Sequence, residues 1–480
     1  MKIAFAASEA APYVKTGGLG DVMQALPTAL SKMPENEVVL MLPYYGSIKY
    51  GSEFKTKYLF CFDVTLGWRQ CHVGLFQLVT RKHGPKVYFI DNEQYFCRDR
   101  IYGEGDDGER FAFFSKAVLA SLNALSFWPD VLHCNDWQTA LIPMLLKSEF
   151  ATAFPYTKSV FTIHNVEYQG WAEETFNMDV LGLPAQYTEV LRFGKDNASN
   201  FMKSAVVMTD AITTVSETYA GELQYPYYAH GMHEILCYYP QKMHGITNGI
   251  DETMFNPRKD PALASCFSPA TAAAGKKANK LALQREVGLT EDEDSAMLAI
   301  VSRFASHKGL DLLTYIADAL LRRRVQLVLL GTGEARYESF FTDLANRYPG
   351  RVATLLKFDA GLANRVYAAA DIYLMPSKSE PCGLSQMIAM RYGAIPVVHA
   401  VGGLHDTVPP YDPATGEGRG FTFRSYNGDD FLAAIDRALA LYYNDPQAFA
   451  DLRVRDMKLD LSWKVPAAKY MALYNEINGK

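Results

Sequence analysis

A lysine and three glycines stand directly after the first strand-like run of the sequence. The stretch KTGGLGDV covers residues 15–22, and the run KIAFAAS covers residues 2–8. In an open α/β sheet, ligands bind beyond the carboxyl ends of the strands, where a following helix offers free N–H groups and the positive end of its dipole. Glycine lets the backbone approach a phosphate without a Cβ clash. We therefore expect Lys15, Gly18 and Asp21 to lie at the binding site of an anionic ligand.

This loop has two other interpretations. It can be a tight strand-to-helix turn that binds nothing. A dinucleotide-binding loop would need glycine where Met23 stands, and an acidic residue about 20 residues further on at the end of the second strand. The run EVVLML instead ends in Pro43, Tyr44 and Tyr45, which argues against a nicotinamide-dependent dehydrogenase.

Two cationic residues follow a strand-like run in the second half. The segment VSRFASHKGLD places Arg303 at the carboxyl end of the run MLAIVS and places Lys308 where a helix begins. Both side chains are expected at the same edge of a parallel sheet. Two cations directed at one place suit a diphosphate, and a surface pair without a ligand is the alternative.

An acidic residue stands beside a second candidate phosphate-binding turn. The run DIYLMP is followed by SKSEPCGLSQMIAMRYG, which places Glu380 on the turn and Gly383 where a helix opens. The N–H groups of Leu384 and Ser385, next to Cys382, would then face a phosphate. A carboxylate there must face another part of the ligand, such as sugar hydroxyls or positive charge developing on a sugar ring. A helix-capping role for Glu380 is the alternative.

Polar residues also follow two strand-like runs in the first half. Asp136 comes after VLHC, and His164 comes after SVFTI. A lone histidine is more often structural than catalytic. The sequence has no G-x-S-x-G motif and no histidine spacing typical of a metal site, so hydrolase and zinc interpretations find no support. The D-x-D segment at residues 292–295 precedes a strand and is expected to be a solvated loop.

The elements that position these residues are short apolar runs that alternate with helical patterns, which predicts βαβ units and parallel sheets. The runs are too many for one ordinary sheet, so we predict two doubly wound domains. Residues 248–261 contain Asn-Gly and two prolines and form the predicted boundary. Residues 266–280 are predicted to be a loose surface connection. Helices are predicted over 109–124, 137–147, 309–323, 335–346, 361–369 and 384–392.

Composition narrows the class of protein. The chain has 480 residues, 49% of them hydrophobic, so large cores can form. Its net charge of -6 argues against a general nucleic-acid or membrane-surface binder. Seven scattered cysteines without a C-x-x-C pattern indicate reduced thiols. We see no signal-peptide pattern and no apolar run of about 18 residues, and we expect a cytoplasmic protein.

The ordered set of motifs resembles a known family. The chain contains, in this order, KTGGLGDV, HCNDWQTAL, FTIHNVEYQG, ITNGID, VSRFASHKGLD, SEPCGLSQMIAMRYG and VGGLHDTV. The combination is similar to the family 5 glycosyltransferases, the bacterial glycogen synthases and plant starch synthases, over residues 1–475. The resemblance implies an α/β GT-B fold, with two Rossmann-like doubly wound domains facing a central cleft. The implied domains are residues 1–253, joined by the last helix at 463–480, and residues 254–462.

The resemblance also implies an activity. Members of the family transfer glucose from a nucleotide diphosphate to the non-reducing end of an α-1,4-glucan, with retention of anomeric configuration. ADP-glucose or UDP-glucose is then the donor, with no metal and no cofactor, and no nucleic-acid or membrane partner is expected. The oligomeric state stays open. The implied catalytic residues are Glu380, His164, Arg303 and Lys308. The implied donor-binding residues are Lys15, Gly18, Asp21, Asn248, Cys382, Gly383, Leu384 and Ser385, with Tyr95 and Asp136 as possible donor or acceptor contacts.

Three other classes of protein share some of these features. A related GT-B transferase that makes sucrose or trehalose phosphate would share the fold. A glucan phosphorylase would need a lysine for pyridoxal phosphate in a motif that we do not find. A non-enzymatic two-domain sugar-binding protein is usually exported, and it would have no reason to gather Lys15, Arg303 and Lys308 at one diphosphate.

Overall fold

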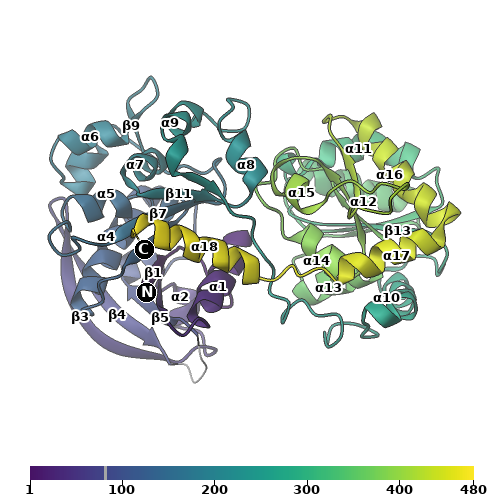
Figure 1. The fold of residues 1–480 in the computed structure, drawn as a ribbon, viewed down its shortest axis with the longest axis horizontal. Helices are drawn as coiled ribbons and strands as arrows, with labels where there is room; N and C mark the ends of the chain where they lie inside the picture. Colours follow the sequence, from purple (N-terminus) through teal and green to yellow (C-terminus); the bar gives the residue numbers. More distant parts are fainter. Residues whose placement is uncertain (80–83, 480) are drawn as a thin grey trace. The chain divides into compact units, whose positions relative to one another are not determined.

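The computed structural model describes residues 1–79 and 84–479, and the chain divides into two compact units (Figure 1). Unit 1 comprises Met1–Asn248 together with the carboxyl-terminal segment that begins at Trp463, and unit 2 comprises Gly249–Ser462. The predicted boundary lay between residues 253 and 254, within the same turn-rich connection. Parallel sheets with helices between their strands occur in both units, which confirms the predicted α/β class.

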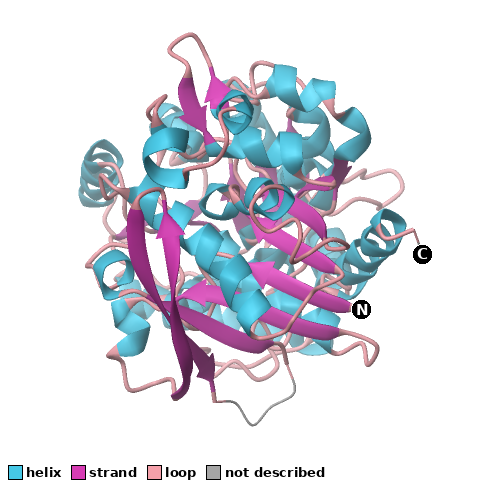
Figure 2. Ribbon diagram, turned by 90° about the vertical axis from the view of Figure 1, so that its left-hand side faces the viewer, coloured by secondary structure: helices cyan, strands magenta, loops and turns pink. Residues whose placement is uncertain are grey.

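Unit 1 is built on a nine-stranded sheet in the order β12-β11-β7-β6-β1-β2-β5-β4-β3. The strands from β12 to β5 pair in parallel, and β4 and β3 continue the sheet as an antiparallel hairpin at one edge (Figure 2). A small sheet in the order β8-β10-β9 is separate from it. The strands are β1 (Lys2–Ala6), β2 (Glu37–Pro43), β3 (Thr56–Leu66), β4 (Arg69–Leu78), β5 (Lys86–Asp91), β6 (Val131–Asn135), β7 (Lys158–Ile163), β8 (Trp171–Ala172), β9 (Arg192–Phe193), β10 (Ala198–Asn200), β11 (Ala211–Thr214) and β12 (Met243–Gly245).

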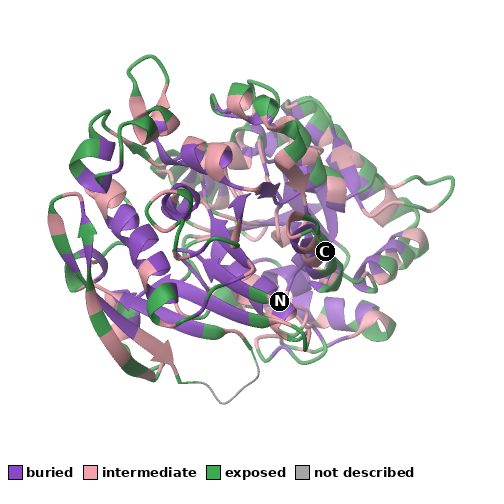
Figure 3. Cartoon of the chain, turned by 60° about the vertical axis from the view of Figure 1, so that its left-hand side comes forward, coloured by how far each residue is buried: buried purple, intermediate pink, exposed green. Residues whose placement is uncertain are grey.

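Burial explains why the central strands are apolar runs. Strand β6 is buried at all five positions, as expected for a parallel strand covered on both faces, whereas β3 alternates between exposed and covered residues (Figure 3). The helices of unit 1 are α1 (Gly18–Ser31), α2 (Gly46–Lys49), α3 (Glu93–Phe96), α4 (Asp107–Ala124), α5 (Ile142–Lys147), α6 (Gln186–Leu191), α7 (Phe201–Met208), α8 (Glu217–Glu222), α9 (His233–Tyr238) and α18 (Lys464–Ile477).

The last helix, α18, belongs to unit 1. The hydroxyl of Tyr474 lies 2.6 Å from Nδ1 of His133 on β6, and the ring of Tyr470 packs against the same imidazole. Burial lowers the pKa of His133 to about 3, so the imidazole is neutral and serves packing. The carboxyl-terminal helix therefore completes the core of the amino-terminal unit.

Unit 2 contains a six-stranded parallel sheet in the order β15-β14-β13-β16-β17-β18. Its strands are β13 (Ala296–Val301), β14 (Val325–Leu330), β15 (Val352–Leu355), β16 (Ile372–Met375), β17 (Ile395–His399) and β18 (Phe421–Phe423). Its helices are α10 (Ala272–Val287), α11 (Leu310–Leu320), α12 (Ala335–Arg347), α13 (Ala360–Ala369), α14 (Ser385–Arg391), α15 (Gly402–Thr407), α16 (Gly428–Asn444) and α17 (Pro446–Met457).

The prediction of a loose connection over residues 266–280 is wrong, because α10 begins within this segment at Ala272. Three consecutive alanines favour the helix. Lys276 and Lys280 are buried, although the sequence places them among polar residues. The ammonium group of Lys276 donates to three backbone carbonyl oxygens, and that of Lys280 pairs with Asp371. These acceptors lie far along the chain, so the sequence pattern alone did not reveal them.

No helix within the described residues is both long enough and apolar enough to cross a membrane.

Candidate active site

The glycine loop of unit 1 is held by a buried glutamate that we did not single out in the sequence. Glu9 follows β1 and is 3% exposed. Its carboxylate accepts hydrogen bonds from the N–H and hydroxyl of Thr16, at 2.5 and 2.7 Å, and from the N–H of Gly17 at 3.2 Å. The hydroxyl of Tyr102 donates to it at 2.6 Å. Glu9 thus fixes the loop immediately before α1 begins at Gly18.

Lys15 and Asp21 lie together at the start of α1. The ammonium group of Lys15 is 2.7 Å from the Asp21 carboxylate, and both side chains are partly exposed. Gly20 lets Lys15 lie across the helix, because a Cβ at position 20 would be 3.0 Å from Lys15 Cγ. Burial raises the pKa of Asp21, while Lys15 opposes that shift. An anionic ligand that binds the Lys15 ammonium group must therefore replace Asp21 as the partner of that group.

Asp136 and His164 are brought together because β6 and β7 are parallel neighbours that end side by side. The Asp136 carboxylate accepts the backbone N–H of His164 at 2.8 Å and that of Asn165 at 3.4 Å. Asp136 itself has φ of 57°, a backbone conformation uncommon outside glycine. Burial raises the pKa of its carboxyl to about 7. Such strain and such a pKa are typical of a functional site.

His164 is neutral, and its tautomer follows from its neighbours. Burial lowers the pKa of its imidazole to about 3. The amide nitrogen of Asn135 donates to the carbonyl oxygens of Ala6 and His133, so its amide oxygen faces His164 Nε2 at 3.0 Å. Nε2 therefore carries the proton and donates it to Asn135. Nδ1 is then an acceptor.

The unit 2 residues Lys308 and Glu380 form an ion pair where β13 and β16 end. Lys308 Nζ lies 2.7 Å from Glu380 Oε2, which also accepts the Ser377 hydroxyl at 2.9 Å. Glu380 is 7% exposed. Arg303 is exposed, and its guanidinium pairs with no carboxylate in the part of the chain that the structure describes. Of the two predicted cations, Lys308 thus lies beside a buried carboxylate, while Arg303 stands exposed just after β13.

Glycines allow these strand ends to approach one another closely. Gly309, next to Lys308, has φ of 71°, and a Cβ there would lie 1.9 Å from the carbonyl oxygen of Pro376. Gly402, at the start of α15, has φ of 44°, and its Cβ would lie 2.1 Å from the carbonyl oxygen of Glu380. Only glycine fits at both positions. The glycine turns therefore fix where Lys308 and Glu380 stand.

The turn before α14 adopts the conformation expected of an anion-binding loop. Gly383 has φ of 71°, and Leu384 caps the helix that Ser385 begins. Among the described residues, the N–H groups of Gly383 and Leu384 have no acceptor. The Ser385 hydroxyl instead turns to the sulfur of Met375 at 3.3 Å, and Cys382 is buried.

Gln386 fixes this turn, and sequence reasoning missed it. Its side-chain amide donates to the carbonyl oxygens of Cys382 and Gly383 and lies 3.0 Å from the Thr407 hydroxyl. Gln386 itself is fully buried. Gln386 thus connects the turn before α14 to the end of α15. A single glutamine among apolar residues does not predict such a long-range contact.

Within residues 1–79 and 84–479, no hydrogen bond, ion pair or ring contact joins Tyr95 or Asn248 to the residues described above. Tyr95 is 2% exposed and donates its hydroxyl to Glu109 at 2.6 Å, with its ring packed on Phe113. Asn248 is 5% exposed, and its amide oxygen is buried with no hydrogen-bond partner among the described residues. The geometry gives Tyr95 a packing role and leaves Asn248 with an unsatisfied acceptor.

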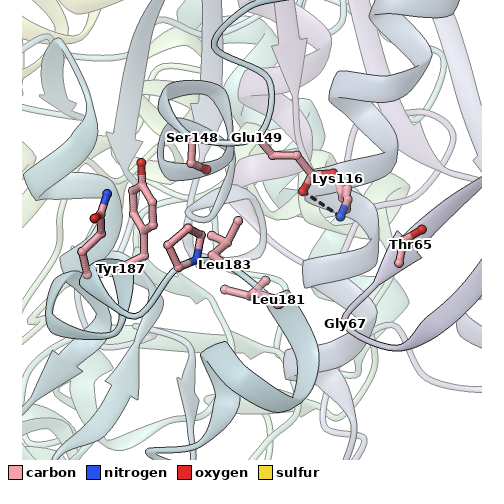
Figure 4. Close-up of a pocket in the computed structure, with 11 residues that line it drawn as sticks. Thr65, Gly67, Lys116, Ser148, Glu149, Leu181, Leu183 and Tyr187 are labelled. Carbon is pink, nitrogen blue, oxygen red and sulfur yellow. Dashed lines mark ion pairs between the residues drawn. The ribbon is translucent and has the colours of Figure 1, made fainter.

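A pocket of about 450 Å³ elsewhere on unit 1 contains none of the predicted site residues (Figure 4). It lies between the β3–β4 turn, α4 and the segment before α6. Lys116 on its wall is buried and pairs with Glu149 at 2.7 Å, so its charge is already balanced. Within residues 1–79 and 84–479, no group of three or more His, Cys, Asp or Glu side chains could hold a metal ion.

We call the two clusters the unit 1 edge (Glu9, Lys15, Gly17, Asp136 and His164) and the unit 2 edge (Arg303, Lys308, Glu380 and Gly383). Each lies at the carboxyl ends of the strands of a parallel sheet, where open α/β sheets bind ligands. Two Rossmann-like units with cations, glycine turns and a buried carboxylate at these edges fit the class that the sequence predicts, a glycosyltransferase of the GT-B fold.

Comparisons with known proteins identify the family within that class. Residues 2–238 match the starch synthase catalytic domain, and residues 285–451 match the glycosyl transferases group 1. The chain is 45% identical to a glycogen synthase of Clostridium perfringens, over 99% of this chain and 98% of that protein. It is 43% identical to a glycogen synthase of Clostridium beijerinckii over the full length of both. The chain belongs to the glycogen and starch synthase family.

Solved structures agree with this assignment. The catalytic domain of starch synthase IV from Arabidopsis thaliana, bound to ADP and acarbose, superposes with a TM-score of 0.92 at 32% identity, covering 100% of this chain and 99% of that one. Sucrose-phosphate synthase from Thermosynechococcus elongatus superposes with a TM-score of 0.60 at 18% identity, covering 100% of this chain and 99% of that one. The second likeness shows the shared fold alone.

Proposed function

We propose that this protein extends an α-1,4-glucan by transferring glucose from ADP-glucose to its non-reducing end, with retention of anomeric configuration. The Lys308–Glu380 ion pair, in the same unit as the exposed Arg303, carries this proposal. Cleavage of the bond between glucose and diphosphate places negative charge on the diphosphate and positive charge on the sugar. Cations next to a buried carboxylate match both charges.

Each edge has its own task in this proposal. Arg303 and Lys308 neutralise the departing diphosphate, helped by the N–H groups that precede α14. Glu380 faces the sugar. Lys15 and Gly18 contact the donor from unit 1, and His164 accepts a hydrogen bond from a sugar hydroxyl at Nδ1.

Transfer then requires no metal and no covalent intermediate. The bond from the anomeric carbon to the diphosphate oxygen breaks, and the acceptor hydroxyl forms its new bond on the same face of the sugar. The acceptor proton passes to the departing diphosphate. The Arabidopsis starch synthase was solved with ADP and acarbose, which supports an adenine nucleotide and a glucan here. None of the seven cysteines, all of which lie within the described residues, forms a disulfide, and we expect a reducing, cytoplasmic setting.

The test supplies purified protein with ADP-glucose or UDP-glucose and with glycogen, in the presence of EDTA. We expect incorporation of glucose into polymer with ADP-glucose as the better donor, and loss of incorporation in Glu380→Ala. Breakdown of donor without polymer growth would refute the synthase assignment. Higher activity with UDP-glucose would replace the proposed donor, and inhibition by EDTA that magnesium reverses would refute metal-free transfer.

A further inference from the structure

A second loop of unit 2 holds the loop that carries both cations of the unit 2 edge. The segment GTGE, residues 331–334, follows β14, which is the neighbour of β13 in the sheet. The N–H of Phe304 donates to the carbonyl oxygen of Thr332 at 2.8 Å, and the N–H of Glu334 donates to the carbonyl oxygen of Phe304 at 2.7 Å. A Cβ at Gly333 would collide with that same oxygen of Phe304, so glycine lets the two loops lie this close.

Glu334 also supplies a cap that the local sequence lacks. Ser306 begins a short 3-10 turn that ends at Lys308, and the residue before it is Ala305, whose methyl group can accept no hydrogen bond. One oxygen of the Glu334 carboxylate fills this place from the other loop, because it accepts the N–H of Ser306 at 2.7 Å and the hydroxyl of Ser306 at 2.6 Å. A carboxylate is a strong acceptor for an N–H at the start of a turn. The bond from the Ser306 hydroxyl lowers the pKa of Glu334 below its ordinary value.

Arg336 closes a ring of hydrogen bonds around this cap. Its Nε donates to the second oxygen of the Glu334 carboxylate at 2.9 Å, and a terminal nitrogen of its guanidinium donates to the Ser306 hydroxyl oxygen at 2.9 Å. The Ser306 hydroxyl therefore donates to Glu334 and accepts from Arg336. Because each of the three side chains is bonded to the other two, the network holds Ser306 in one position although it lies at the surface.

The same turn is tied on its other side to the loop that carries Glu380. The N–H of Lys378 donates to the carbonyl oxygen of His307 at 2.9 Å, and Lys308 Nζ lies 2.7 Å from Glu380 Oε2. The turn of residues 306–308 thus lies between the loops that follow β14 and β16. A shift of its first residue moves Lys308 against Glu380, since one residue separates the two ends of the turn.

We propose that Glu334 is a positioning residue for glucose transfer, because it fixes the turn that sets the place of Lys308 beside Glu380. The proposal rests on the proposed function, which assigns Lys308 to the departing diphosphate. In this role Glu334 touches neither the sugar nor the diphosphate and acts through Ser306. A displaced Lys308 ammonium group would stabilise the charge of the diphosphate less in the transition state. Binding of the glucan does not depend on that charge.

The first experiment compares the kinetics of the wild type with those of Glu334→Ala and Glu334→Gln. A displacement of about 1 Å can cost roughly 100-fold in rate. Because the loops stay tied at Phe304 and Lys378, we expect a smaller loss in Glu334→Ala, about tenfold in kcat, with the KM for glycogen unchanged. Glu334→Gln keeps an oxygen that can accept both the N–H and the hydroxyl of Ser306, so it should recover most of the rate.

The second experiment needs no turnover. Hydrogen–deuterium exchange of the amides in residues 303–309, without donor, should be faster in Glu334→Ala than in the wild type. Asp343→Ala is the matched control in both experiments, because Asp343 pairs with Arg347 further along the same helix, α12, and it should change neither exchange nor kcat. The side chain of Glu334 is 38% exposed, so Glu334→Ala should fold and keep a Tm close to that of the wild type.

A wild-type kcat in folded Glu334→Ala would overturn the proposal. Equal losses in Glu334→Ala and Glu334→Gln would also overturn it, because the negative charge and not the hydrogen bonds would then matter. A lower kcat with wild-type exchange over residues 303–309 would show that Glu334 acts on the substrate directly, which contradicts a positioning role. If the wild type fails to extend glucan at all, the proposed function fails, and the exchange measurement still decides whether Glu334 holds the turn.

Discussion

The unit 1 edge and the unit 2 edge differ in how their charges are held. In unit 1 the carboxylates of Glu9 and Asp136 are committed to backbone N–H groups, His164 is neutral, and Lys15 is paired with Asp21. In unit 2 Arg303 is exposed without a carboxylate partner among the described residues, and Lys308 adjoins Glu380. We infer from this difference that, in the proposed reaction, unit 2 supplies charge, whereas unit 1 supplies shape and hydrogen bonds.

Removing the ion pair of the unit 2 edge should have the largest effect. We expect Glu380→Ala and Lys308→Ala each to lower kcat by about 10²–10³, because each deletes charge stabilisation in the transition state. The double variant should be little worse than the poorer single variant, since the two groups act as one unit. Initial rates of ADP release with saturating glycogen measure this effect.

Lys15→Ala in unit 1 provides the variant whose loss of activity is compared with that of Lys308→Ala in unit 2. Its loss should be about tenfold, because Asp21 already engages the Lys15 ammonium group. A larger loss in Lys15→Ala than in Lys308→Ala would reverse the division of roles between the two edges.

Gly17 of the unit 1 edge and Gly402, which touches Glu380 of the unit 2 edge, should respond differently to substitution by alanine. Gly402→Ala forces a Cβ to within 2.1 Å of the Glu380 carbonyl oxygen. Since a displacement of about 1 Å can cost roughly 100-fold in rate, we expect a loss of that size together with a lower Tm. A Cβ at Gly17 meets nothing within 4 Å, and Gly17 has φ of -154°.

Gly17→Ala should therefore keep the wild-type Tm and raise the KM for ADP-glucose, because the open space beside it is where we place the donor. Kinetics and thermal unfolding of the two variants measure the contrast. A Gly17→Ala variant with wild-type donor KM would show that this glycine serves the turn alone.

Sequence reasoning located most of the central strands and the residues that follow them. Apolar runs with turn residues at their ends are local signals, and Arg303, Lys308, Asp136 and His164 stand at such ends. Glu9 escaped notice because its meaning depends on Tyr102, 93 residues away in the chain. Gln386 and the buried lysines of α10 were not predicted for the same reason, because their partners also lie far away in the sequence.

Tyr95 shows that even a residue singled out from the sequence has partners that the sequence does not reveal. The resemblance implies that Tyr95 is a possible donor or acceptor contact, but its packing on Phe113 and its hydrogen bond to Glu109 are not visible in one sequence. The hairpin of β3 and β4 was also not predicted, because its half-exposed strands lack a continuous apolar run. Local pattern thus predicted the elements and the ends of strands, while side-chain partners required the folded structure.

Glu9→Gln tests whether the unit 1 edge acts through shape. The amide oxygen of Gln can accept the N–H groups of Thr16 and Gly17, but its NH2 group then faces the hydroxyls of Thr16 and Tyr102, which now donate to the other carboxylate oxygen. Leaving one such donor unsatisfied costs about 1–3 kcal/mol, so kcat/KM for ADP-glucose should fall on the order of tenfold. The KM for maltotriose should not change, and a fall in both would indicate general unfolding of the unit. Steady-state kinetics with each substrate varied in turn provide the measurement.

The last prediction concerns stability and isolates the half-buried carboxyl of Asp136. Its ordinary pKa is 3.8, and burial raises the pKa to about 7 in the folded chain. Between these values the folded chain holds a proton that the unfolded chain has lost. The free energy of unfolding therefore falls as pH rises from about 4 to about 7, by on the order of 2–4 kcal/mol at about 1.4 kcal/mol per pH unit.

Asp136→Asn keeps an acceptor for the His164 N–H but cannot ionise. The stability of the wild type relative to this variant should consequently decline across that pH window and level off above it. Denaturation followed by tryptophan fluorescence reports the unit concerned, because all five tryptophans of the chain lie in unit 1. Parallel stability curves for the two proteins would mean that Asp136 is already ionised at low pH, and the unit 1 edge would then carry a fixed negative charge opposite in sign to the unit 2 cations.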